Sequence, residues 1–233
     1  MKTSFWTKLF DVIAPRTCIV CGNRLSADES MICAVCHLHL PLTRYQSKAT
    51  DNPMARLFWG KIPVEKAAAL FFYEPQAEYS RIIYDMKYHG HRETCQLMGE
   101  MTARLFSKES FFDGIEMLIP VPLTLRRRWQ RGYNQSLEIA RGVSKTTGIP
   151  VCKNAIRRIR FKESQTRRHA SERLQNVEHA FQLADGAEQI AGRHVLLIDD
   201  IVTTGATMTA CGQELAKIAG VKISVLSLGL TKT

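Results

Sequence analysis

An unbroken apolar run at 195–198 is followed by two carboxylates and a loop of small residues. The run reads VLLI and suits a strand that is buried on both faces of a parallel sheet. After it comes DDIVTTGAT at 199–207, and a helical pattern extends over 208–219. Strand, loop and helix in this order place the loop at the carboxyl edge of a sheet, where open α/β folds bind ligands.

Strand-like and helix-like stretches alternate along most of the chain. Short apolar runs predict strands at 64–73, 117–121, 155–159 and 221–230. Helical periodicity marks 76–87, 93–107 and 137–143. Residues 160–176 are dense in arginine and lysine, which predicts a loop or an exposed hood. The alternation predicts an α/β fold, in which a mainly parallel sheet is flanked by helices on both faces.

Two CxxC knuckles stand near the N-terminus, at Cys18 and Cys21 and at Cys33 and Cys36, with eleven residues between them. Two such knuckles can place four thiolates at the corners of a tetrahedron, which is a strong zinc signature. Because the protein would fill all four positions, this zinc would be structural and would hold together a segment too small to bury its own core. A redox CxxC pair is the alternative, although two copies argue against it.

Prolines and glycines divide the chain into three parts. We expect an N-terminal helix and the four-cysteine zinc module at 1–50, a linker at 51–63 and the α/β domain at 64–233. No apolar run approaches the roughly 20 residues that span a bilayer. Seven cysteines without a secretion signal favour a reducing cytoplasm. The formal net charge of +10 favours anionic partners, either phosphates or nucleic acid.

The carboxylates of Asp199 and Asp200 need a partner other than phosphate, which they repel. Ribose hydroxyls can donate hydrogen bonds to them, and Mg²⁺ takes such oxygen ligands. The loop at 203–207 supplies hydroxyls, a glycine that admits close approach and the positive end of a helix, all of which suit a phosphate. One ligand with a 5-phosphate, ribose hydroxyls and an Mg²⁺-bound pyrophosphate is phosphoribosyl pyrophosphate (PRPP). The alternative is an ordinary Asp-Asp turn at a strand end.

Four separated motifs carry a resemblance to one family. They are KYHG at 87–90, IPVP at 119–122 with RGYNQ at 131–135, SQ at 164–165 with ERLQN at 172–176, and DDIVTTG at 199–205. In this order and with the four-cysteine module, they resemble the ComF family of phosphoribosyltransferase-like proteins. The resemblance spans nearly the whole chain and implies the fold of type I phosphoribosyltransferases. It also implies a role in natural competence, the uptake of transforming DNA.

The resemblance assigns site residues as well. Asp199 and Asp200, the catalytic pair, would hold the ribose hydroxyls and the Mg²⁺ shell. The residues that would cradle the 5-phosphate are Thr203, Thr204, Gly205, Ala206 and Thr207. The pyrophosphate loop would consist of Val121, Pro122 and Leu123. The residues that would contact pyrophosphate from flexible loops are Arg131, Gln165 and Arg173, with Lys87 as a further candidate. For each basic residue, the alternative is a solvated surface charge.

Thr203 stands at a position where some purine transferases carry an acid that serves as general base. A hydroxyl with an ordinary pKa is a poor general base at neutral pH. We therefore do not expect a hypoxanthine or guanine transferase of that type, and no residue identifies the acceptor.

Two functions follow as competing hypotheses. The first is Mg²⁺-dependent phosphoribosyl transfer from PRPP to an unidentified acceptor. The second is a non-catalytic single-stranded DNA-binding or adaptor protein of the DNA-uptake machinery, with a helicase or recombination factor as partner. Basic and aromatic side chains are interleaved at Arg126, Arg127, Arg128, Trp129 and Tyr133. This suits DNA binding, because aromatic rings stack bases while arginines hold phosphates, and the same residues could equally cover a pyrophosphate site. Both hypotheses place the protein in the cytoplasm, and the second also at the inner face of the membrane uptake machinery.

Overall fold

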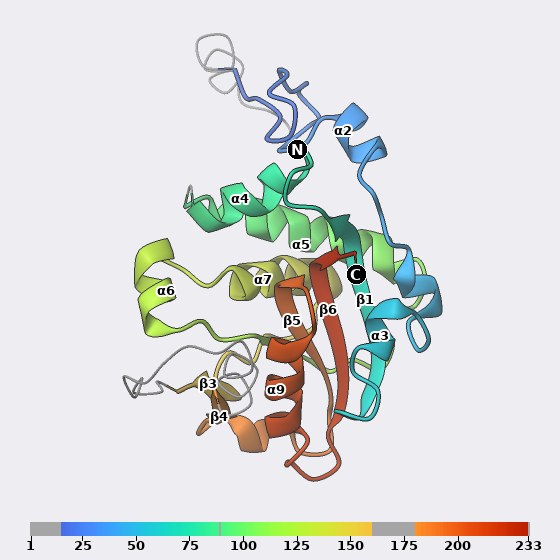
Figure 1. The fold of residues 1–233 in the computed structure, drawn as a ribbon, viewed down its shortest axis with the longest axis vertical. Coiled ribbons are helices and arrows are strands. Elements are labelled where there is room, and N and C mark those ends of the chain that lie inside the picture. The colour runs from blue at the N-terminus through green and yellow to red at the C-terminus, as the bar shows by residue number, and fades with distance from the viewer. Residues whose placement is uncertain (1–14, 89, 160–179, 233) are drawn as a thin grey trace, which may run out of the picture.

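A four-stranded parallel sheet forms the centre of the molecule (Figure 1). The computed structural model describes residues 15–88, 90–159 and 180–232. The strands follow the order β1-β6-β5-β2, and each pairing is parallel. Their bounds are Val64–Tyr73 for β1, Met117–Pro120 for β2, His194–Val202 for β5 and Lys222–Thr231 for β6. The predicted α/β fold with a mainly parallel sheet is confirmed.

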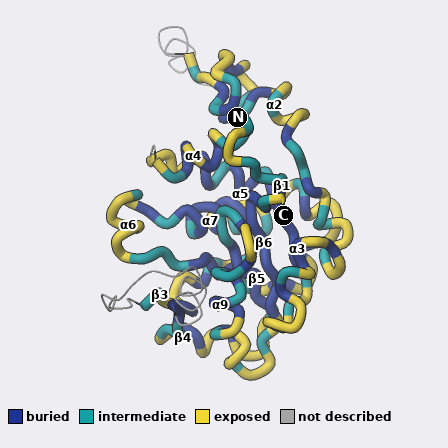
Figure 2. Tube along the Cα trace, viewed as in Figure 1, coloured by how far each residue is buried: buried dark blue, intermediate teal, exposed yellow. Residues whose placement is uncertain are grey.

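Two apolar cores cover the two faces of the sheet. Along β5, Leu196 and Ile198 belong to one core, whereas Val195 and Leu197 belong to the other. The first core includes side chains of α4 (Ser80–Tyr88), α5 (Arg92–Ser107) and α7 (Gln135–Thr147). The second includes side chains of α3 (Pro53–Arg56) and α9 (Ala206–Leu215). Figure 2 shows the strands as buried segments between these layers. Coverage on both faces explains why the β5 run is apolar at every position.

Helices α5 and α7 touch at two glycines. A Cβ atom on Gly142 would lie 2.0 Å from the carbonyl oxygen of Gln96, and one on Gly99 would lie 2.3 Å from that of Ile139. Only glycine leaves room for two helix backbones at this separation. The contact therefore fixes where α7, and the residues at its first turn, can lie.

A second, two-stranded sheet packs beside α9 instead of extending the central sheet. The strand predicted at 155–159 exists as β3 (Ile156–Arg158), but it pairs antiparallel with β4 (Phe181–Leu183). The sequence pattern did not indicate β4, because three residues are too few to give a periodic signal. The hood predicted at 160–176 lies outside the described residues.

The segment predicted as a linker, 51–63, packs against the α/β domain. It contains α3, and the side chains of Met54 and Phe58 are fully buried. Asn52 caps α3 by accepting a hydrogen bond from the N–H of Met54, and its Nδ2 donates to the carbonyl of Ala67 on β1 at 2.8 Å. The segment is thus tied to the sheet, while the domain boundaries at 50 and 63 stay a prediction.

The remaining elements are short. They are α2 (Ala34–Leu38) among the cysteines, η1 (Tyr45–Lys48), α6 (Leu125–Arg131) between β2 and α7, and η2 (Ala187–Ile190). The helix predicted at the N-terminus lies in 1–14, outside the described residues. In the described part of the chain, no helix combines the length and the apolar content that crossing a bilayer requires.

Replacing Gly142 by alanine tests the contact between α5 and α7. The added methyl group meets the backbone of Gln96, so the helices must move apart, and we expect the free energy of unfolding to fall by about 3 kcal/mol or more. Gly148→Ala is the matched control, because its φ of +76° strains alanine while no atom lies within 4 Å of the new methyl group. This control substitution should lower the free energy of unfolding by only about 1–2 kcal/mol. Urea unfolding measures both, and equal losses would contradict the close contact.

Candidate functional site

The acid pair lies at the carboxyl end of β5, beside the loop that follows β2. Asp199 and Asp200 are in the last part of β5. Strand β2 ends at Pro120, opposite Ile198, and the N–H of Val121 donates to the carbonyl of Ile198 at 2.9 Å. The loop at 121–123 therefore begins next to the acid pair, because parallel strands release their chains at the same edge of a sheet.

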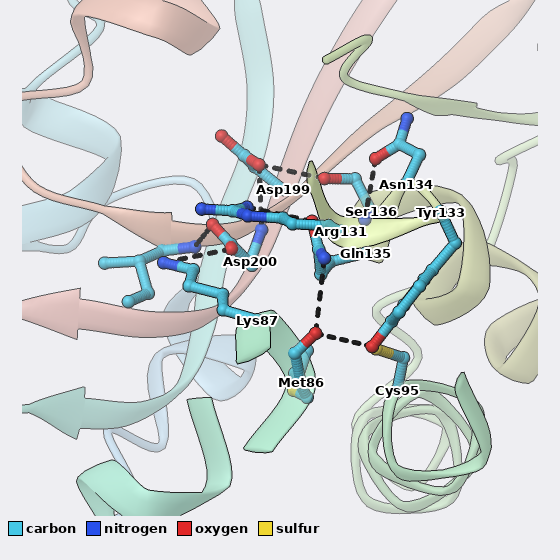
Figure 3. A network of polar contacts seen from close by, with 11 residues as sticks. Met86, Lys87, Cys95, Arg131, Tyr133, Asn134, Gln135, Ser136, Asp199 and Asp200 are labelled. Carbon is cyan, nitrogen blue, oxygen red and sulfur yellow. Dashed lines mark hydrogen bonds and ion pairs between the residues drawn. The ribbon is translucent and has the colours of Figure 1, made fainter. Parts of the chain in front are cut away.

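Asp199 is held by the first turn of α7. The hydroxyl of Ser136 and the N–H of Asp200 each donate to its Oδ1 at 2.9 Å. Asn134 connects α7 to the neighbouring loop: its Oδ1 accepts from the N–H of Ser136 at 3.1 Å, and its Nδ2 donates to the carbonyl of Val121 at 2.9 Å. The acid, the helix and the loop thus form one connected unit, and Figure 3 shows its part from Asp199 through Ser136 to Asn134.

The pKa of the Asp199 carboxyl is raised from 3.8 to about 7. Burial is the largest cause, and the charge of Asp200 adds to it. The hydrogen bonds from the Asp200 N–H and from Ser136, and the charge of Lys87, act in the opposite direction. Asp199 can therefore change its charge near neutral pH, which is a property of many functional carboxyls.

Asp200 is paired with Lys87 from the last turn of α4. The Lys87 Nζ lies 3.1 Å from Oδ2 of Asp200, and the two side chains are 20% and 14% exposed. The end of α4 is fixed by the carbonyl of Met86, which accepts hydrogen bonds from the hydroxyl of Tyr133 and from Nε2 of Gln135 (Figure 3). The structure thus brings Lys87, from the KYHG motif, to the acid pair.

The loop predicted to cradle a phosphate joins β5 to α9. Gly205 has a φ of +78°, and a Cβ atom there would lie 3.1 Å from Cε1 of Phe58, so the position favours glycine. Thr203 and Thr204 are exposed, and α9 begins at Ala206. Together with Asp199, residues 201–208 border a hollow of about 50 Å³. The first N–H groups of α9 have no partners within the helix, and that of Ala206 donates to Oγ1 of Thr204 at 3.5 Å beside this hollow.

The residues predicted to contact pyrophosphate are described only in part. Arg131 is the last residue of α6, and its Nη1 donates to Oε1 of Gln135 at 2.9 Å. Figure 3 shows its guanidinium directed toward the acid pair. Gln165 and Arg173 lie outside the described residues.

Sequence reasoning assigned no role to Ser136, which donates to Asp199, or to Gln135, which connects Arg131 with the carbonyl of Met86. The available signal was their position: Gln135 ends the RGYNQ motif, and Ser136 follows it at the start of a helical pattern.

The residues predicted to contact DNA lie in two different environments. Helix α6 begins after Thr124, whose hydroxyl accepts a hydrogen bond from the N–H of Arg127 at 3.2 Å. The arginines at 126–128 are exposed, Trp129 is 88% exposed, and α6 lies at the periphery of the fold in Figure 1. Tyr133 is only 5% exposed, so its ring cannot stack on a base. The prediction that Tyr133 contacts DNA is therefore wrong for this structure.

The four cysteines converge on one point. The Sγ atoms of Cys18, Cys21, Cys33 and Cys36 all lie within 4.8 Å of one another, and those of Cys21 and Cys33 are 3.8 Å apart. Sulfurs bonded at about 2.3 Å to one tetrahedral ion are about 3.8 Å apart, so this cluster can hold a metal ion. Burial raises the pKa of the Cys18 thiol, but the N–H groups of Cys21, Cys33 and Val20 outweigh burial and lower it to about 7. Burial and the neighbouring thiols raise the pKa of Cys36, so only part of the cluster is shifted toward the thiolate form that binds metals.

The cysteine cluster rests on α4. Val20 and Met31 share an apolar core with Ile82 of that helix. Arg81, also on α4, donates from Nη1 to the carbonyl of Val20 at 2.8 Å. Figure 1 shows the cysteine segment next to α4, on the side away from α7. The same helix therefore contacts the cysteine cluster through Arg81 and the acid pair through Lys87.

A family model described as Phosphoribosyl transferase domain matches residues 121–228. The matched range starts at the loop after β2, includes the acid pair and the loop at 203–207, and ends within β6. The parallel sheet and this match together define the class: the chain contains a phosphoribosyltransferase-like domain.

Curated relatives of the chain are competence and DNA-utilization proteins. Competence protein F from Haemophilus influenzae is 36% identical over 113 residues, which is about half of either protein: 48% of this chain and 49% of that one. Competence protein ComFC from Bacillus subtilis is 30% identical over 139 residues, 58% of this chain and 53% of that protein. DNA utilization protein YhgH from Escherichia coli (strain K12) is 26% identical over 219 residues, 91% of this chain and 88% of that protein. The chain is similar to these competence and DNA-utilization proteins, which supports the resemblance to the ComF family that its motifs indicated.

The raised pKa of Asp199 predicts a stability that depends on pH. The fold favours the protonated carboxyl of Asp199. Its contribution to the free energy of unfolding is therefore fully present below about pH 4, declines as the pH rises and is lost above about pH 7. Asp199→Asn keeps the shape of the side chain and does not ionise. We expect the melting temperature of the variant to exceed that of the wild type by a margin that grows from pH 4.5 to pH 7.5. Each kcal/mol of difference in the free energy of unfolding should shift the melting temperature by about 2–4 °C.

Scanning calorimetry at several pH values measures this margin. Asp113→Asn is the control, because Asp113 is an exposed carboxyl away from the sheet edge and its replacement should give a margin near zero throughout. A margin for Asp199→Asn that stays constant or shrinks as the pH rises would contradict the raised pKa.

Proposed function

We propose that this protein binds PRPP together with Mg²⁺ at the carboxyl edge of its sheet and acts in DNA uptake as a phosphoribosyltransferase-like protein. The observation that carries the proposal is the meeting of three features at one edge: the acid pair, the loop at 203–207 and the loop at 121–123. Similarity to proteins named for competence and DNA utilization supports the biological role.

The two loops suit the two anionic ends of PRPP. The 5-phosphate fits the loop at 203–207, because the N-terminus of α9 offers N–H groups and a positive dipole, and Thr203 and Thr204 add exposed hydroxyls. The pyrophosphate fits the side of 121–123, where Arg131 supplies a fixed charge and a planar set of donors. Asp199 and Asp200 lie where the ribose would connect the two ends, and they can accept hydrogen bonds from its hydroxyls.

The residues present also fit a bound Mg²⁺. The acid pair offers the carboxylate oxygens that Mg²⁺ prefers, and a raised pKa allows Asp199 to give up its proton as the cation binds. When bound, the ion would neutralise charge on the departing pyrophosphate.

Transfer to an acceptor would rest on charge stabilisation. The bond between the ribose C1 and a pyrophosphate oxygen would break with its electrons leaving on pyrophosphate, and C1 would bond to the acceptor. The ring would develop positive charge in between, with the acid pair on the side of the ribose hydroxyls. Arg131 would hold the departing pyrophosphate. Thr203 supplies no general base, so the acceptor must be reactive without one at this position.

Calorimetric titration of PRPP in the presence of Mg²⁺ tests the proposal. The wild type should bind, and the double variant Asp199→Asn with Asp200→Asn should lose at least about 100-fold in affinity, because each charge-assisted hydrogen bond contributes about 1.5–3 kcal/mol. Trp129→Ala is the matched control, since that side chain is 88% exposed and should not affect PRPP binding. No binding by the wild type, or equal binding by the double variant, would contradict the proposal.

Single-stranded DNA binding is the second candidate function, and the exposed Trp129 favours it. The ring stands among the arginines at 126–128, and Leu125, Arg126, Arg128, Trp129 and Gly132 border an open hollow of about 640 Å³. Aromatic rings can stack on bases while arginines hold phosphates. The Trp129→Ala variant therefore separates the two functions: DNA affinity that depends steeply on salt should fall, while PRPP affinity stays unchanged.

A structural zinc ion held by the four cysteines completes the proposal. Four thiolates leave no position open for a substrate, so the ion would stabilise the fold and take no part in a reaction. Because Val20 and Met31 share a core with α4, loss of the ion would loosen the attachment of this segment to the domain.

Elemental analysis of the purified protein should find one zinc ion per chain. Cys36→Ser should lose the ion and lower the melting temperature, and a chelator should do the same to the wild type. Cys152→Ser is the control, because Cys152 is buried in the other core and should leave the zinc content unchanged. A zinc-free wild type whose melting is indifferent to the chelator would contradict the assignment.

A further inference from the structure

We propose that Lys87 serves as an internal cation for the acid pair: its ammonium holds Asp200 until Mg²⁺ and PRPP enter, and then turns to the pyrophosphate. The inference rests on the proposed PRPP site and adds a residue that controls how readily this site accepts a cation. It gives Lys87 two successive partners, first a carboxylate of the protein and then the ligand.

The Lys87–Asp200 pair is enclosed, unlike an ordinary surface ion pair. The Nζ atom of Lys87 lies 3.1 Å from Oδ2 of Asp200, with only 20% and 14% of the two side chains exposed. In the pair of Lys145 with Glu100, the lysine is 71% exposed although the distance is 2.7 Å. Reduced exposure to water strengthens the attraction between charges, so the ammonium of Lys87 is held in the site rather than displaced by solvent.

Lys87 and a divalent cation compete for the same carboxylate. Asp200 uses Oδ1 to accept from the N–H of Ile201 at 2.7 Å, which leaves Oδ2 as the oxygen that meets Lys87. Mg²⁺ needs carboxylate oxygens and tolerates little distortion of its octahedral shell. An ammonium at Oδ2 therefore opposes entry of the ion both by occupying that oxygen and by charge repulsion.

The backbone of α4 is anchored, so the exchange involves the side chain. Arg81 ties one part of the helix to the carbonyl of Val20, and the carbonyl of Met86 accepts hydrogen bonds from Tyr133 and Gln135. The four-carbon stem of a lysine can swing its ammonium without moving such a backbone.

The pyrophosphate side of the site is within the same network. Gln135 donates from Nε2 to the carbonyl of Met86 at 3.2 Å and accepts from Arg131 at its Oε1. This one side chain therefore connects the residue next to Lys87 with the residue proposed to hold the pyrophosphate, and Figure 3 shows both Lys87 and Arg131 close to Asp200. A pyrophosphate held by Arg131 would give the Lys87 ammonium a second anionic partner.

Replacing Lys87 by methionine should change two affinities in opposite directions. Affinity for Mn²⁺ alone, measured by electron paramagnetic resonance, should rise by at least about fivefold, because a positive charge near the acid pair is removed. Affinity for PRPP with Mg²⁺, measured by calorimetry, should fall by about tenfold, the loss expected for one charge-assisted contact. Lys87→Arg keeps the charge and should leave Mn²⁺ affinity near that of the wild type.

Lys145→Met is the matched control, because it removes a paired lysine outside the site and should change neither affinity. Mn²⁺ affinity that is unchanged or lower in Lys87→Met, or no Mn²⁺ binding by either protein, would overturn the internal-cation role. Unchanged PRPP affinity in the Lys87→Met variant would overturn the proposed contact of Lys87 with the pyrophosphate. If PRPP binds to neither wild type nor variant, the proposed function fails, while the Mn²⁺ comparison still decides whether Lys87 holds off a cation.

Discussion

Burial of β5 on both faces decides where the acid pair lies. Val195 and Leu197 fill one core, Leu196 and Ile198 fill the other, and the first carboxylates come only where the strand reaches the edge of the sheet. Because β2 and β6 run parallel to β5, their chains emerge at the same edge. The loop at 121–123 and the start of α9 are gathered there by topology alone, before any contact between polar side chains forms.

Three helices then determine how the acids are presented. The close contact of α7 with α5 at Gly142 sets the position from which Ser136 donates to Asp199. Helix α4 brings Lys87 to Asp200, and α9 offers its N-terminus to the adjoining hollow. Two neighbouring carboxylates at a partly enclosed edge repel each other. Burial, together with the charge of Asp200, raises the pKa of Asp199, and Asp200 forms an ion pair with Lys87.

The structural features that could be predicted from the sequence are those that depend on residues close together in the chain. The bounds of β1 were predicted as observed, and the order of β5, acid pair, small-residue loop and α9 could be read along one stretch. The four cysteines converge as their spacing indicated, because each CxxC turn is local. These patterns depend on periodicity and on turn chemistry, which a single chain displays directly.

The features that escaped prediction depend on contacts between distant segments. Ser136 donates a hydrogen bond to Asp199, which is 63 positions away in the chain, and no local sequence pattern predicts such a contact. Tyr133 stands in a basic, aromatic run that resembles a nucleic-acid surface, yet its hydroxyl reaches Met86 and its ring is buried. The segment at 51–63, whose role as a linker stays a prediction, places the buried ring of Phe58 next to Gly205. In each case tertiary packing overrides what composition suggests.

The central claim is that the carboxyl edge of β5 is a site for PRPP and Mg²⁺, and a crystal structure of the protein with both would test it most directly. The account predicts density for the 5-phosphate against 203–207 and for the pyrophosphate beside 121–123, with the ribose hydroxyls at Asp199 and Asp200. Density for PRPP at any other surface, or an acid pair left bare at saturating ligand, would contradict it.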